Sequence, residues 1–135
     1  MKQVKIYQRA QGIIEAYEKT LTANKIAVMC LSNNYTAVIG DYFDNKYVAR
    51  IKELGIEMRE ILPDTMGNRE DSKRKPKNLV RFIGLDMPSE SDFILYDDKA
   101  MLVSFDPNSP MALEITDRNI VSNLRTQYEE LWRRL

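Results

Sequence analysis

Hydrophobic positions in the first half of the chain follow two alternating patterns. Residues 2–8 and the apolar runs Lys25–Leu31 and Ile56–Leu62 are short and either alternating or continuously apolar, which predicts β-strands. Residues 11–21 and Asp44–Gly55 carry apolar side chains at helical spacing, which predicts helices, the second starting at an Asp cap and ending at a Gly. The order strand, helix, strand, helix, strand predicts a parallel sheet with right-handed crossovers.

The second half of the chain has a different pattern. Asp64–Asn78 is a long polar segment, which we expect to be a solvated loop. Four short apolar runs follow it, at residues 79–83, 92–96, 100–105 and 112–115. Their close spacing predicts strands that join the sheet as antiparallel hairpins.

A final helix is expected to start at Thr116 or Asp117, which are both good N-caps. Its apolar stripe has helical spacing and consists of Ile120, Leu124, Tyr128, Leu131 and Leu135, with Trp132 beside it. The chain is therefore predicted to be an α/β protein with a mixed sheet, parallel in its first half and antiparallel in its second, flanked by helices. Residues 1–135 are expected to form a single domain.

Composition restricts the possible partners and compartments. Basic and acidic residues balance at 20 each, so no overall field draws the chain to nucleic acid or to an anionic membrane. No apolar run approaches the roughly 18 residues of a membrane span, and the N-terminus does not resemble a signal peptide. A cytoplasmic protein without membrane contact is expected. The single cysteine, Cys30, lies in an apolar run and is predicted to be an inert core side chain.

The chain contains no histidine. This excludes a histidine nucleophile, a Ser-His or Cys-His pair, and a zinc or iron site with histidine ligands. We expect no cofactor and no resident metal. Any chemistry would fall to carboxylates, lysines or tyrosines.

Several segments together resemble the phospholipase D-like domain of TrmB-type transcriptional regulators. They are "EMREILP" (57–63), "LVRFIG" (79–84), "DFILYDDKAMLVSF" (92–105) and "YEELWRRL" (128–135). The resemblance implies a homodimeric domain without enzymatic activity that serves a regulator in dimerisation or effector sensing. It also implies that DNA is contacted only through an N-terminal helical domain. We expect no such domain within residues 1–135, which start directly at the first strand, so that it was either cut off or never present.

The same resemblance locates the catalytic position of the phospholipase D enzymes. Their hairpin carries His-x-Lys and, after four further residues, Asp. Aligning that Asp with Asp97 places Glu90 at the histidine position and Asp92 at the lysine position. Two acidic groups would repel a phosphodiester, and catalysis through a phosphohistidine is excluded.

Two groups of residues are candidates for binding a small effector. Ser32, Asn33, Asn34 and Tyr35 follow the central strand, where ligands of open α/β sheets often bind, although these residues are also common in ordinary connections. Glu90 and Asp92 would give the neighbouring pocket an acidic lining, which favours a cation or a polyhydroxy compound.

Two alternatives remain open from the sequence. Asp92, Asp97 and Asp98 could serve a metal-dependent phosphodiesterase, although Asp97 and Asp98 are more simply explained as a hairpin turn. The basic loop Lys73–Lys77 could contact nucleic acid, but acidic residues lie in the same segment and no aromatic residue is interleaved with it.

Overall fold

The computed structural model describes residues 3–76, 79–87 and 89–135. Its elements, in chain order, are β1 (Val4–Gln8), α1 (Arg9–Thr20), β2 (Lys25–Cys30), α2 (Tyr35–Ile39), the π-helix η1 (Tyr42–Tyr47), α3 (Val48–Leu54), β3 (Glu57–Pro63), α4 (Met66–Ser72), β4 (Val80–Ile83), β5 (Ser91–Tyr96), β6 (Lys99–Ser104), β7 (Met111–Ile115) and α5 (Arg118–Arg134). The strands of this described part form one sheet of seven in the order β1-β7-β6-β5-β2-β3-β4. The predicted fold class, α/β with a mixed sheet flanked by helices, is confirmed.

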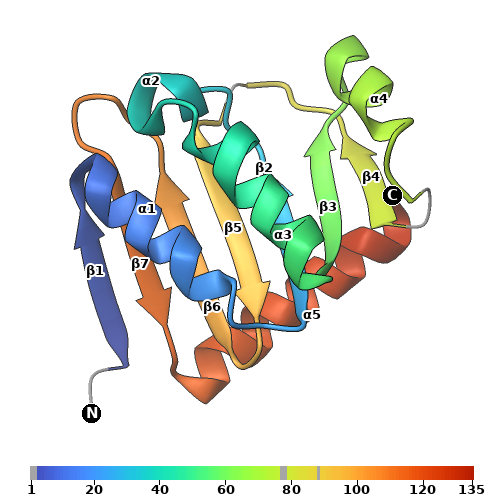
Figure 1. Ribbon diagram of the computed structural model, residues 1–135. Helices are drawn as coiled ribbons and strands as arrows, with labels where there is room; N and C mark the ends of the chain where they lie inside the picture. The colour runs from blue at the N-terminus through green and yellow to red at the C-terminus, as the bar shows by residue number, and fades with distance from the viewer. Residues whose placement is uncertain (1–2, 77–78, 88) are drawn as a thin grey trace.

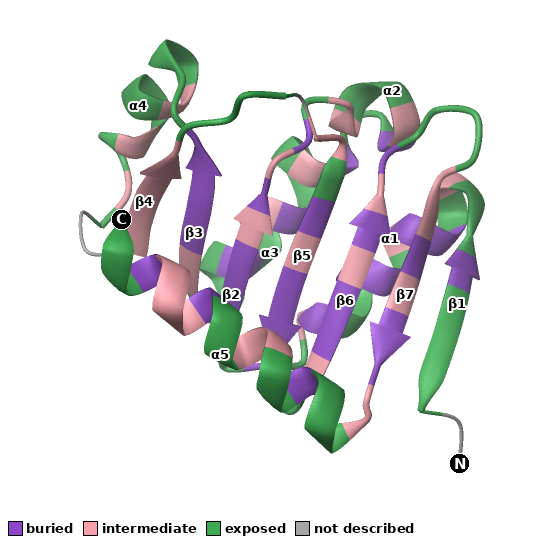
Figure 2. Cartoon of the chain, turned by 180° about the vertical axis from the view of Figure 1, so that it is seen from behind, coloured by how far each residue is buried: buried purple, intermediate pink, exposed green. Residues whose placement is uncertain are grey.

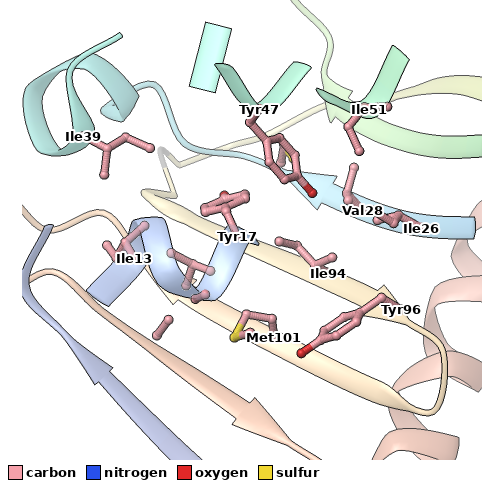
Figure 3. Packing of buried hydrophobic residues seen from close by; sticks show 14 of the residues in the cluster. Ile13, Tyr17, Ile26, Val28, Ile39, Tyr47, Ile51, Ile94, Tyr96 and Met101 are labelled. Carbon is pink, nitrogen blue, oxygen red and sulfur yellow. The ribbon is translucent and has the colours of Figure 1, made fainter. Parts of the chain in front are cut away.

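Helices cover the two faces of the sheet unequally. Helices α1, α2, η1 and α3 lie on one face, and α5 crosses the other (Figure 1). Between the sheet and the first group of helices lies the larger hydrophobic core, with Tyr17, Tyr47, Ile94 and Met101 at its centre (Figure 3). A smaller core, built around Tyr128 and Trp132, lies under α5.

Two strands pair differently from the prediction. β1 pairs antiparallel with β7 at the far edge of the sheet, so three strands separate it from β2. β4 was expected to join as an antiparallel hairpin, but it pairs parallel with β3. The reason is the connection: the polar segment before β4 returns the chain to the opposite end of the sheet, as a crossover must.

That polar segment is not a plain loop, contrary to the prediction. Residues Met66–Ser72 form α4, whose start is capped by the Thr65 side chain accepting a hydrogen bond from the Asn68 amide at 3.1 Å. No residue of α4 is buried. A hydrophobic pattern therefore could not have predicted this helix.

The middle helical region also departs from the prediction. Asp44 does not cap a helix but lies inside η1, and α2 is a short helix for which the sequence made no prediction. Gly55 does end α3, with a left-handed φ of 67°. The predicted stop is therefore confirmed and the predicted start is wrong.

The last helix begins as predicted and packs most of the predicted stripe, with Tyr128 and Trp132 buried and Leu124 and Leu131 partly buried against the small core. The Asp117 side chain accepts a hydrogen bond from the Ile120 amide at 2.9 Å, which confirms the cap. Ile120 and Leu135 are exposed, however, and the buried side chains are Val121, Tyr128 and Trp132. No helix in the described part of the chain is long and apolar enough to cross a membrane.

Candidate functional site

A polar cluster forms where the end of β2 meets the start of β5. The two strands run antiparallel, with Cys30 opposite Asp92. This register places the loop that follows β2 directly against the residues that precede and begin β5. Segments 60 residues apart in the sequence therefore share one site.

Glu90 anchors the loop that follows β2. Its carboxylate accepts hydrogen bonds from the Ser32 hydroxyl at 2.8 Å and from the Asn33 amide at 2.9 Å. The Ser32 oxygen in turn accepts from the Asn34 amide at 3.0 Å, and the Asn34 side chain donates to the Phe105 carbonyl at 3.3 Å. The loop is thereby held to both β5 and the end of β6.

Asp92 is the most buried acidic group of the cluster, with 1% of its surface exposed. It accepts hydrogen bonds from the Tyr17 hydroxyl at 2.6 Å, from the Tyr35 hydroxyl at 2.8 Å and from the Ser32 amide at 3.4 Å. Burial raises the pKa of Asp92 to about 6, and these donors, which stabilise the carboxylate, oppose the rise. Asp92 is thus a carboxyl group that titrates close to neutral pH.

Aromatic rings surround the two tyrosines that donate to Asp92. Tyr35 stacks on Phe43 with ring centroids 4.5 Å apart and meets Phe105 edge-on at 4.8 Å. Tyr17 meets Tyr47 edge-on at 5.0 Å. Sequence reasoning assigned Tyr17 to a helical core stripe and missed its part in the site, because nothing near it in the sequence indicates a carboxylate 75 residues away.

The structure brings all of the predicted ligand residues into this cluster, namely Ser32, Asn33, Asn34, Tyr35, Glu90 and Asp92. Their polar atoms bond chiefly to one another, so the cluster is closed by internal hydrogen bonds. Asn33 is exposed and Glu90 is half-buried, which leaves one side of the cluster next to solvent. Ligand binding at these residues stays a prediction.

The three carboxylates suggested for a metal site do not come together. Asp92 lies at the start of β5, whereas Asp97 and Asp98 form the exposed turn at its other end, about 17 Å along the strand. Asp97 has a φ of 51°, as the favoured two-residue hairpin turn requires, so the turn prediction is confirmed. Among the described residues no group of three acidic or thiol side chains could hold a metal ion.

Acidic partners accompany the basic segment around α4. Lys73 pairs with Glu70 at 2.9 Å, Arg74 with Asp71 at 2.9 Å, and Lys75 with Glu60 at 2.9 Å. Lys77, the last residue of the predicted basic loop, lies outside the described residues. The charges that are described balance locally, which does not favour a nucleic-acid contact through this segment.

Comparison with solved structures identifies the fold. TrmBL2, an archaeal chromatin protein with a novel mode of DNA binding, matches with a TM-score of 0.61 and 14% identity over 98% of this chain and 53% of TrmBL2. This chain therefore spans about half the length of TrmBL2. Neither a protein-family model nor a curated protein sequence matches the chain.

Two further structures match over most of their own length. NucT from Helicobacter pylori has a TM-score of 0.69 and 12% identity over 94% of this chain and 93% of its own. Nuc from Salmonella typhimurium, a phospholipase D family member, has a TM-score of 0.66 and 15% identity over 96% of this chain and 93% of its own.

These matches correct one expectation. The chain was predicted not to be an enzyme, and its fold contradicts that prediction, because it is the fold of a phospholipase D family member. The missing histidine excludes one catalytic route and does not exclude activity as such. At this level of identity the likeness concerns the fold alone, and the chain has a phospholipase D-like fold.

Proposed function

We propose that this phospholipase D-like domain is the pairing and effector-sensing part of a TrmB-like transcriptional regulator. The likeness to TrmBL2 over 98% of this chain supports the type of regulator. The observation that carries the pairing is an apolar sheet face that the described helices leave partly uncovered.

This open face is a row of paired residues on the same side of the sheet as α5. Ile6 pairs with Leu113, Leu113 with Leu102, Leu102 with Phe93, and Phe93 with Met29. Side chains at paired positions share one face, and Leu102, Phe93 and Met29 pack partly against the small core under α5. The row is therefore continuous across five strands.

Helix α5 covers only one end of this face. Figure 2 shows it crossing near the ends of the central strands, with half-exposed positions on the sheet beyond it. Ile6 is 56% exposed, and the other four members of the row are half-buried. A continuous apolar surface of this kind marks an interaction site, and a second copy of the domain would cover it.

Sedimentation of a charged variant tests the pairing. We expect the unmodified domain to sediment as a dimer at tens of micromolar and Ile6→Glu to sediment as a monomer, because a buried unpaired carboxylate would oppose the interface. Leu54→Glu is the matched control: Leu54 is 47% exposed but ends α3 on the opposite face. A monomeric unmodified domain, or a dimer that survives Ile6→Glu, would refute pairing through this face.

A second candidate function is phosphodiester hydrolysis without histidine. It is favoured by the match to Nuc and NucT over 93% of each of those chains. Asp92 is the acidic group best placed to take part, because it occupies the corresponding hairpin and has a raised pKa. The test is turnover of bis(p-nitrophenyl) phosphate with and without Mg²⁺, which should be lost in Asp92→Asn and kept in Asp98→Asn; no turnover by the unmodified chain removes this candidate.

A further inference from the structure

Residues 32–40, which include α2, are attached to the sheet by their side chains and by amides that bond to carboxylates. In the described part of the chain no backbone-to-backbone hydrogen bond joins this segment to a strand; its own lie within the segment, as from the Val38 amide to the Asn34 carbonyl. Only Ser32 and Ile39 of the segment are buried. Figure 2 shows α2 at one end of the sheet, mostly exposed or half-buried.

The polar contacts of this segment converge on two carboxylates of the chain that leads into β5. The Ser32 hydroxyl and the Asn33 amide donate to Glu90, and the Tyr35 hydroxyl and the Ser32 amide donate to Asp92. The only other described hydrogen bond from the segment to the sheet goes to a backbone carbonyl. The closed position of α2 therefore depends on the charge of Glu90 and Asp92.

The segment has a defined point of departure from the sheet and a glycine at its far end. The Leu31 amide still donates to the Ser91 carbonyl at 3.3 Å, so the chain leaves the sheet at Ser32. Gly40 ends α2 with a φ of 61° and a ψ of −133°, and no heavy atom lies within 4 Å of the place that a side chain would take. A glycine at the end of an element can absorb the backbone change of a hinge.

Asp92 is buried without a cationic partner. No lysine or arginine among the described residues forms an ion pair with it, and the residue opposite it on β6 is Val103. The titratable groups that act on it from the other elements are Tyr17 on α1, Cys30 on β2, Tyr35 on α2 and Tyr47 on η1. Of the nearby carboxylates, Glu90 is acidic as well, and Glu60 on β3 is paired with Lys75. An ionised Asp92 is thus a buried charge that only neutral donors stabilise.

We propose that residues 32–40 form a lid over Asp92, which opens about Gly40 when Asp92 loses its proton. Opening replaces the Ser32 and Tyr35 donors by water, which solvates the carboxylate, while Tyr17 stays on α1. It also uncovers Glu90 and Asp92, two of the predicted ligand residues. The inference rests on the proposed function only for the role of these uncovered residues as an effector site; the opening itself does not depend on it.

The direction of the pH effect follows from the burial of Asp92. Burial raises its pKa to about 6 in the closed state, whereas in the open state the carboxyl group regains the ordinary aspartate value of 3.8. The equilibrium constant for opening is therefore smallest below about pH 4, rises as the pH increases, and levels off above about pH 6. The total rise is the ratio of the two acid dissociation constants, about a hundredfold.

Cys30 is a natural reporter of this opening. It is the one cysteine of the chain, it is 8% exposed, and it pairs with Asp92 across β2 and β5. Its thiol interacts with the side chains of Tyr35 and Asp92, and burial raises the pKa of the thiol. Because Tyr35 leaves with the lid, opening exposes the thiol, and the rate at which Cys30 is labelled reports the open population.

Labelling of the full chain with dithiodipyridine between pH 4 and pH 7 tests the lid. The labelling rate of the urea-unfolded chain at each pH serves as the reference, which removes the pH dependence of the thiol itself. We expect the ratio of the two rates to rise about a hundredfold across this range. A rise of less than about tenfold would overturn the proposal.

The urea dependence of labelling separates the lid from global unfolding. A local opening exposes little surface, so the labelling rate of the folded chain should be nearly constant at low urea concentrations. If labelling instead follows the global unfolding equilibrium at every urea concentration, no separate lid exists and the proposal fails.

Two variants assign the effect to Asp92. Asp92→Asn should give an opening constant that does not change with pH, and Asp98→Asn, at the exposed turn, should follow the unmodified chain. Tyr35→Phe keeps the ring that packs on Phe43 and Phe105 but removes a donor to Asp92. It should raise the opening constant several-fold at pH 7 and less at pH 4, because a hydrogen bond to the ionised carboxylate is the stronger one.

Two results with these variants would contradict the assignment. One is an unchanged pH profile in Asp92→Asn, and the other is an equal effect of Tyr35→Phe at both pH values. Sedimentation of the same proteins reports pairing separately, so failure of the lid and failure of the proposed function remain distinguishable.

Discussion

At the scale of single residues, two neighbouring carboxylates have taken different roles. Glu90 is half-buried and holds the loop after β2 through Ser32 and Asn33. Asp92, two positions later on the same side of the strand, is buried under two tyrosine hydroxyls. The sequence predicted both as lining one pocket, and only their burial separates an anchor from a group that titrates near neutral pH.

The titration of Asp92 predicts a pH dependence of stability. Burial raises its folded pKa to about 6 from the ordinary aspartate value of 3.8, so the folded state binds the proton more tightly than the unfolded chain. The contribution of Asp92 to the free energy of unfolding is then largest below about pH 4 and falls as the pH rises through about 6, by about 3 kcal/mol in all. Asp92→Asn should lack this fall.

Urea unfolding at a series of pH values between 4 and 7 provides the measurement. The quantity of interest is the stability of the unmodified chain minus that of the variant, since other carboxylates, such as Glu129 with its lowered pKa, contribute the opposite slope to both proteins. Asp98→Asn, at the exposed hairpin turn, is the control and should follow the unmodified chain. If the free energy of unfolding of Asp92→Asn and that of the unmodified chain change with pH in parallel, titration of Asp92 does not cause the pH dependence.

At the scale of elements, two helix ends followed the local chemistry of a single residue. Asp117 caps α5 and Gly55 ends α3, as their residue types predict. The start of the second helix was mispredicted, because Asp44 lies inside η1, whose wider π-turn begins before the expected cap, whereas Tyr47 and Ile51 are buried in the core. Helix α4 was not predicted, because none of its side chains is buried and a hydrophobic pattern therefore does not indicate it.

Two glycines test the role of backbone conformation at this scale. Gly55→Ala should lower the free energy of unfolding by about 1 kcal/mol, because its φ of 67° is unfavourable for a side chain although the space around it is open. Gly67→Ala, inside α4 and also in open space, should be neutral or slightly stabilising. Thermal unfolding of both variants checks the contrast, and equal effects would refute the conformational explanation.

At the scale of the whole molecule, strand order and the position of α5 decide the available surfaces. Because β7 lies between β1 and β6, Ile6 joins a row that reaches Met29 across the sheet. Because α5 crosses only one end, that row remains partly open (Figure 2). The proposed pairing through this row predicts that the apparent free energy of unfolding rises with protein concentration in the unmodified chain but not in Ile6→Glu.

One part of the candidate site was predicted from the sequence and another part was not. Two groups of residues were predicted separately: Ser32–Tyr35 from the loop beyond a central strand, and Glu90 and Asp92 from the hairpin of the related fold. Only the structure shows that they form one cluster. The part of Tyr17 in the site was not predicted. It depends on which helix lies over which strand, and no local pattern contains that information.

Local physical chemistry, readable from the sequence, determined the strands, most helix ends, the Asp97–Asp98 turn and the absence of histidine chemistry. Each of these depends on residues close together in the chain. Tertiary structure alone decided that β1 closes the far edge, that β4 is parallel, and that Asp92 is buried beneath Tyr17 and Tyr35. These features arise from contacts between distant segments, whose register is set by packing of the whole sheet and not by any one stretch of sequence.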